Sequence, residues 1–209
     1  TSPVLNTFIS DVKKVSSTKT WTIFLTNAGD VLTCGWNLEG QLGTGDKEQS
    51  LTPKLLLSLE GEACRDVMAF ETIGYAVNGE GTVYTWGSTD NSRLLNPTII
   101  EETKGMRVVN IIGVRDGWYA LTESGLCIWK LRRSFGQITA FHDGVNIVEM
   151  DQCGKYTVLF LADDGRVFAF THVHNGSGLL GIGDARCTIR NDSEEPRPVH
   201  SILLDSLHP

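Results

Sequence analysis

The chain lacks the features that mark several protein classes. It has no apolar run near the roughly 18 residues that cross a bilayer, and we find no secretory signal in it. Its five cysteines are odd in number, lie far apart and form no Cys-x-x-Cys pair, so neither a zinc site nor a redox dithiol is predicted. We therefore expect reduced, mostly buried thiols in an intracellular protein, cytoplasmic or nuclear, with no membrane partner.

Positive charge is also scarce. Lysine and arginine number 18 against 25 aspartates and glutamates, which gives a formal net charge of −7. Nucleic-acid binding depends on cations that displace the counterions of the phosphate backbone, so direct nucleic-acid binding is unlikely. A local basic patch could still override the sum. The hydrophobic share of 41% is ordinary for a globular protein and suffices for a core.

No strong amphipathic helical pattern occurs, whereas short β-rich stretches recur. The clearest unit, residues 12–53, has such stretches at 12–15, 20–26 and 31–34. Gly29 lies in the turn between the last two, where a positive φ is needed. The glycine-dense segment that follows, from Gly35 to Gly45, excludes a helix.

The same pattern returns three times, with turn glycines spaced 40 to 52 residues apart at Gly29, Gly81, Gly125 and Gly165. A period in this range is typical of propeller blades. Fourteen residues before these glycines stand Val15, Val67, Ile111 and the exception Asp151, which has Met150 beside it. Each turn is followed by an apolar stretch. We align residues 31–34 with 83–86, 126–129 and 167–170, so that Trp129 of the third repeat is equivalent to Trp86 of the second. We predict repeats at 12–63, 64–106, 107–144 and 145–209, with 1–11 as the tail of a preceding repeat.

The segment from Gly35 to Gly45 resembles the signature G-x-N-x-x-G-Q-L-G-x-G of the regulator of chromosome condensation (RCC1) repeat. The matching residues are Gly35, Asn37, Gly40, Gln41, Leu42, Gly43 and Gly45, joined by Trp86 and Gly87 in the second repeat and by Gly178, Gly181 and Gly183 in the last. Pro53, Pro97 and Pro198 stand where each repeat's trailing proline is expected. The resemblance implies an all-β fold, an RCC1-like β-propeller with about four blade repeats in this chain. Such rings usually have about seven blades, so we expect further blades or a second chain to complete the ring.

The sequence departs from the family pattern at several places. Cys34 replaces the usual tryptophan of the first repeat, and residues 88–95 form a loop in place of the glycine motif of the second. Residues 130–133 form a basic cluster in the third, which is either a solvated loop or a surface for an acidic partner. The chain is thus a divergent member of the family it resembles.

No catalytic constellation is found, so we predict no enzyme, no catalytic residue and no cofactor. His172 and His174 alternate along a strand-like run and could face one side, as a metal pair requires. The alternative is that both are solvent-facing or hydrogen-bonded, and no metal is predicted. The glycines from Gly35 to Gly45 are followed by no Gly-Lys-Ser/Thr, so they do not indicate a phosphate-binding loop.

Partner-binding residues are expected where the sequence departs from the blade pattern, because loops on a rigid scaffold commonly bind. The candidates are Trp36, Arg93, Trp118, Tyr119, Arg132 and Arg133, together with the loop 184–197. For Trp118 the alternative is packing between blades. The function predicted first is a non-enzymatic protein-interaction or scaffold module within a larger assembly. Two alternatives come from the resemblance: guanine-nucleotide exchange on a small GTPase, as in the founding member of the family, and chromatin association.

Overall fold

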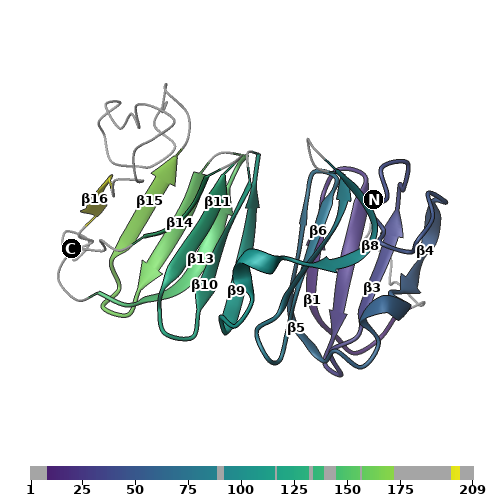
Figure 1. The fold of residues 1–209 in the computed structure, drawn as a ribbon, viewed down its shortest axis with the longest axis horizontal. Coiled ribbons are helices and arrows are strands. Elements are labelled where there is room, and N and C mark those ends of the chain that lie inside the picture. The colour runs from purple at the N-terminus through teal and green to yellow at the C-terminus, as the bar shows by residue number, and fades with distance from the viewer. Residues whose placement is uncertain are drawn as a thin grey trace, which may run out of the picture. The chain divides into compact units, whose positions relative to one another are not determined.

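The chain folds into four consecutive antiparallel sheets, as the computed structural model in Figure 1 shows. The structure describes residues 9–88, 92–115, 117–131, 134–138, 145–155, 157–171 and 199–202. Within these ranges no helix is long and apolar enough to cross a membrane. The predicted all-β class is confirmed, and each sheet falls inside one predicted repeat.

The first two sheets, blades 1 and 2, each contain four strands in sequential order and end in a 3₁₀ turn. Blade 1 consists of β1 (Val12–Ser17), β2 (Trp21–Thr26), β3 (Val31–Gly35) and β4 (Ser50–Leu55), followed by η1 (Leu57–Leu59). Blade 2 consists of β5 (Cys64–Phe70), β6 (Ile73–Asn78), β7 (Val83–Ser88) and β8 (Arg93–Ile99), followed by η2 (Glu101–Thr103).

Blades 3 and 4 repeat the same order of strands. Blade 3 consists of β9 (Val108–Val114), β10 (Gly117–Thr122), β11 (Cys127–Leu131) and β12 (Ser134–Ile138). Blade 4 consists of β13 (Ile147–Cys153), β14 (Thr157–Ala162), β15 (Val167–Thr171) and β16 (Val199–Ile202). The four sheets therefore form a series of four-stranded antiparallel blades, as the predicted propeller repeats require.

Local sequence explains the strands and their turns. Residues of β2 alternate between buried and half-buried, as expected of a strand whose two faces differ. The predicted turn glycines adopt positive φ, for example 92° at Gly29 and 87° at Gly81. Pro53 and Pro97 lie in β4 and β8, the edge strands of their sheets, where a missing N–H is tolerated.

The chain divides into two compact units, residues 1–111 and 112–209. In the first unit, blades 1 and 2 share one apolar core of Trp21, Ile23, Leu25, Val31, Leu42, Leu56, Leu59, Cys64, Val67, Ala69, Ala76 and Trp86. In the second unit, the rings of Tyr119 and Phe160 meet edge to face, with centroids 6.1 Å apart. Cys127 Sγ lies 3.7 Å from Met150 Sδ in the same region.

Strand register corrects two of the alignments made from the sequence. Cys127 pairs with Leu121 as Val31 pairs with Leu25, so Lys130 and not Trp129 is the counterpart of Trp86. Likewise, Met150 pairs with Phe160 as Val15 pairs with Phe24, so the apolar position belongs to Met150 rather than Asp151. The turn glycine itself gives the first correction, since Cys127 follows Gly125 by two residues just as Val31 follows Gly29, and the alignment at 126–129 was one residue out. The second has a structural cause, because the segment between Met150 and Gly165 is one residue longer than that between Val15 and Gly29.

Candidate functional site

The glycine-rich segment forms the connection between β3 and β4, which we call the motif loop (residues 36–49). Asn37 is buried and organises it. Its Oδ1 accepts a hydrogen bond from Leu42 N at 2.9 Å, and its Nδ2 donates to the carbonyl oxygens of Asp46 and Glu48, both at 3.1 Å. One side chain thereby satisfies backbone groups along the loop, which fixes a segment that has no regular secondary structure.

The motif loop of blade 1 packs against blade 2. Trp86 Nε1 donates a 2.8 Å hydrogen bond to Gln41 O, and Gly45 N donates a 2.9 Å bond to Leu95 O. A Cβ atom on Gly43 would lie 2.8 Å from Trp86 Cδ1, and one on Gly40 would lie 2.7 Å from the side chain of Leu95. Glycine at these two positions allows the loop to approach β7 and β8 closely, so the motif holds two blades together.

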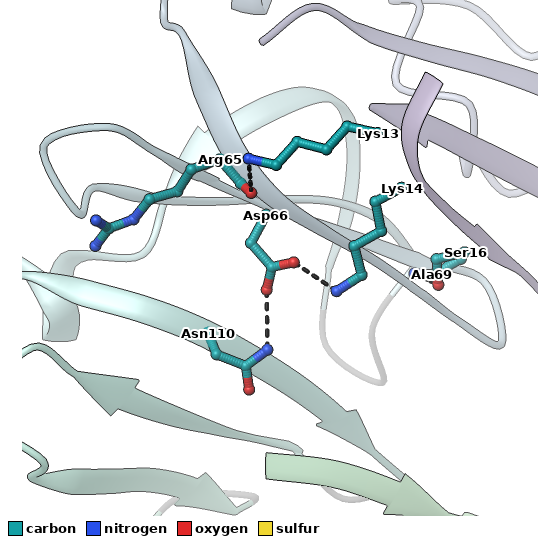
Figure 2. A network of polar contacts seen from close by, with 7 residues as sticks. All are labelled: Lys13, Lys14, Ser16, Arg65, Asp66, Ala69 and Asn110. Atoms are coloured by element: carbon teal, nitrogen blue, oxygen red, sulfur yellow. Dashed lines mark hydrogen bonds and ion pairs between the residues drawn. The ribbon is translucent and has the colours of Figure 1, made fainter. Parts of the chain in front are cut away.

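A polar network joins the first strands of the blades within the first unit (Figure 2). The Asp66 carboxylate accepts hydrogen bonds from Lys14 Nζ at 2.5 Å and from Asn110 Nδ2 at 3.0 Å. Asp66 is buried, and each of its oxygens has a donor, so the cost of removing its charge from water is offset. The network fixes β5 relative to β1 and the first half of β9.

The surface of the motif loop carries two exposed apolar side chains. Trp36 is 47% exposed and Leu38 is 55% exposed. Next to them, Glu39 forms an ion pair with the guanidinium of Arg93, which lies at the start of β8. The ion pair therefore links the loop segment that carries Trp36 and Leu38 to the start of β8, where Arg93 lies. We call Trp36, Leu38, Glu39 and Arg93 the Trp36 patch.

The segment that contains Arg93 is more regular than the sequence indicated. A loop was predicted over 88–95, but β7 continues through Ser88 and β8 begins at Arg93. Ser88 and Arg93 are paired across the two strands. A short hairpin thus replaces the long motif loop in blade 2.

The other predicted partner-binding residues lie elsewhere. Trp118 and Tyr119 in β10 are buried, and Trp118 stacks at a tilt on Phe135, with ring centroids 6.4 Å apart. Lys130 and Leu131 lie in β11 rather than in a loop. Outside the described residues lie Arg132, Arg133, His172, His174, Gly178, Gly181, Gly183 and the loop 184–197.

The described side chains include few groups suited to metal binding or nucleophilic chemistry. No group of three histidines, cysteines or acidic residues comes together there in a way that could hold a metal ion. Cys34, Cys64 and Cys127 are free thiols, and burial raises the pKa of each. Because the thiolate is the nucleophile, a raised pKa makes these cysteines unreactive near neutral pH.

Sequence reasoning missed Leu38 and Glu39. Both occupy positions that the signature leaves open, so the pattern itself gives no reason to select them. One signal was available for Leu38. It is an apolar residue at a position that the signature leaves open, two residues after Trp36, in a glycine-rich loop expected at the surface. The ion pair joins residues 54 positions apart and needed the blade contacts to be found.

Comparisons with known proteins agree with this fold. Residues 28–69 match the regulator of chromosome condensation (RCC1) repeat. The chain is 38% identical over 76 residues to mouse inhibitor of Bruton tyrosine kinase, a match that covers 36% of this chain and 6% of that protein. It is 27% identical to the ultraviolet-B receptor UVR8 of Arabidopsis thaliana over 93% of this chain and 47% of the receptor.

Two solved structures resemble the chain in fold. Human WBSCR16 has a TM-score of 0.71 at 22% identity, over 83% of this chain and 50% of that one. Prp20p of Saccharomyces cerevisiae, described with its binding to Gsp1p and histones, has a TM-score of 0.68 at 13% identity, over 95% and 52%. The chain thus spans about half the length of UVR8 and of both structures, and a far smaller part of the kinase inhibitor.

Proposed function

This chain is a divergent RCC1-like repeat protein, and we propose that it is a non-enzymatic interaction module that holds a partner protein through the Trp36 patch. The observation that carries the proposal is the exposure of Trp36 and Leu38 on a loop whose backbone is fixed by Asn37. A large apolar side chain presented on a rigid loop loses little conformational entropy when it binds. We infer an intracellular location, in cytoplasm or nucleus, because the partners named for Prp20p, Gsp1p and histones, are intracellular proteins.

The composition of the Trp36 patch supports binding to protein. Tryptophan and arginine are enriched among residues that dominate interface energies, and they act best when a polar rim excludes water from them. Here Glu39, which follows Leu38 in the chain, forms an ion pair with Arg93, and the pair supplies charges of both signs. The partner surface expected is therefore an apolar pocket with a mixed polar rim, not an extended basic or acidic face.

The first partners to test follow from the comparisons. Prp20p, which shares the fold, is described with its binding to Gsp1p and histones, so a small GTPase and histones are the first candidates. Guanine-nucleotide exchange would appear as accelerated nucleotide release from the GTPase when the chain is added. We favour simple binding, which requires only the exposed apolar side chains of Trp36 and Leu38.

The proposal is tested with two variants of the full chain. Trp36→Ala combined with Leu38→Ser removes the apolar part of the Trp36 patch, while Leu57→Ser removes a more exposed leucine on η1. Tagged proteins are used to capture partners from cell extract, and the captured proteins are quantified by mass spectrometry. We expect a partner retained by wild type and Leu57→Ser but lost from the double variant. Equal recovery by all three proteins would show that the Trp36 patch binds nothing.

A further inference from the structure

One face of blade 1 is apolar and uncovered in the described chain. Val15, Phe24 and Leu32 are direct cross-strand partners in β1, β2 and β3, so their side chains lie on the same face. Val15 is 54% exposed, and Leu51 in the edge strand β4 is 91% exposed. We call these four residues the open face.

The corresponding positions of blade 2 show what covers such a face. Val67, Ala76 and Tyr84 are its counterparts of Val15, Phe24 and Leu32, and they pack into the core shared with blade 1. Leu95 is the counterpart of Leu51, since each follows the residue paired with the last glycine of the third strand. Leu95 is contacted by Gly40 of the motif loop. The open face thus matches the inner face and glycine loop of another RCC1-type blade.

Charge identifies which blade fits. Lys14 on β1 contacts Asp66, its counterpart on β5, so equivalent positions of first strands meet between neighbouring blades (Figure 2). In blade 4 the counterpart is Glu149, because Glu149 pairs with Leu161 as Lys14 pairs with Leu25. Glu149 is exposed. A blade 4 placed before blade 1 would therefore set a carboxylate beside the Lys14 ammonium.

We propose that blade 4 of one copy of this chain covers the open face of blade 1 of a second copy, in a head-to-tail contact. The described motif loop is already engaged with β7 and β8 of its own chain, so it is not available to cover the open face. Because the two contacting surfaces differ, the contact is heterologous.

Sedimentation velocity of the full chain over a range of concentrations tests this contact. We expect wild type to associate as concentration rises, whereas Leu51→Lys and Glu149→Lys remain monomeric. Both positions are exposed, so neither substitution should unfold the chain. Leu57→Lys is the matched control, since Leu57 is also exposed but its counterpart in blade 2 is the exposed Glu101, outside the open face. It should associate like wild type.

Mixing the two monomeric variants gives a second, independent readout. Leu51→Lys keeps an intact blade 4 and Glu149→Lys keeps an intact open face, so one contact can form between them and dimers should reappear in the mixture. A wild type that stays monomeric up to its solubility limit would overturn the proposal, as would association that survives Leu51→Lys. These variants leave the Trp36 patch intact, so failure here leaves the proposed partner binding untouched.

Discussion

Gly117 in β10 pairs with Leu131 in β11, so in blade 3 the glycine of this pair lies on the second strand and the large residue on the third. Blades 1 and 2 have the reverse arrangement. There a large residue of the second strand, Trp21 or Ile73, lies opposite a glycine of the third, Gly35 or Gly87. In each case a Cβ on the glycine would overlap a nearby backbone carbonyl, which is Lys130 O for Gly117. Blade 3 thus keeps the close approach of the strands although it lacks the family glycine.

The first prediction concerns this exchanged pair. Gly117→Ile should destabilise the protein by roughly 2 to 4 kcal/mol, because the added side chain has no space beside Lys130 O. Adding Leu131→Gly allows the backbone at 131 to adopt the positive φ that Gly87 has in blade 2, so that Lys130 O can turn away from the new side chain, and should recover part of that loss. Urea denaturation of the two single variants and the double variant measures the coupling between the positions. Strictly additive free energies would show that the two sites are independent.

The motif loop gives a second prediction. Gly43→Ala should lower the free energy of unfolding by about 3 kcal/mol, since it combines an unfavourable positive φ with a contact 2.8 Å from Trp86. Gly61→Ala is the matched control, because Gly61 also has a positive φ but has no atom near its Cβ position. It should cost only about 1 kcal/mol. Thermal and urea unfolding measure both variants. If Gly43→Ala and Gly61→Ala lost the same free energy of unfolding, the Trp86 contact would be unimportant.

The polar network around Asp66 predicts a selective effect of charge removal. Asp66→Ala leaves the half-buried amide of Asn110 without its acceptor and should destabilise by about 2 kcal/mol, a value reduced because Lys14 is partly exposed to solvent. Glu101→Ala removes the acidic partner of an exposed ion pair with Lys104 and should change stability by less than about 0.5 kcal/mol. Chemical denaturation of both variants distinguishes a buried network from an ordinary surface pair.

Cys64 predicts a loss of stability at alkaline pH. Burial, with smaller contributions from Glu62 and Asp30, raises the pKa of its thiol from 9.0 to about 12. Between these values the unfolded chain releases the proton while the folded chain retains it, so stability falls as pH rises above about 9. The loss attributable to Cys64 is at most about 1.4 kcal/mol per pH unit. Cys64→Ala should lessen the decline between pH 8 and pH 10, and an unchanged decline would assign it to other groups, including Tyr119.

Much of the fold could be predicted from the sequence because its strongest signals are local. A turn that requires positive φ selects glycine, so Gly29, Gly81, Gly125 and Gly165 marked the four repeats and all adopt positive φ. The motif from Gly35 to Gly45 likewise identified a closely packed loop. Such requirements depend on a few neighbouring residues and are visible without knowing what lies across the blade.

The parts that could not be predicted depend on contacts between distant segments. The exposed Leu38 acquires meaning only from the Glu39–Arg93 pair beside it, and that pair depends on how blade 1 packs against blade 2. Register had the same limit before the fourth turn, because one extra residue between Met150 and Gly165 moved the counterpart of Val15 without changing the apolar pattern. Burial of Tyr119 against Phe160 also needed the packing of blades 3 and 4.

The most direct test of the account is site-specific photo-crosslinking from the Trp36 patch in cells. A photoreactive amino acid is placed at position 36, 38 or 57 of the full chain, and crosslinked proteins are identified by mass spectrometry. The account predicts that positions 36 and 38 capture the same partner, that position 57 does not, and that Arg93→Ala weakens the capture while leaving the melting temperature nearly unchanged. Identical capture from all three positions, or none from 36 and 38, would contradict it.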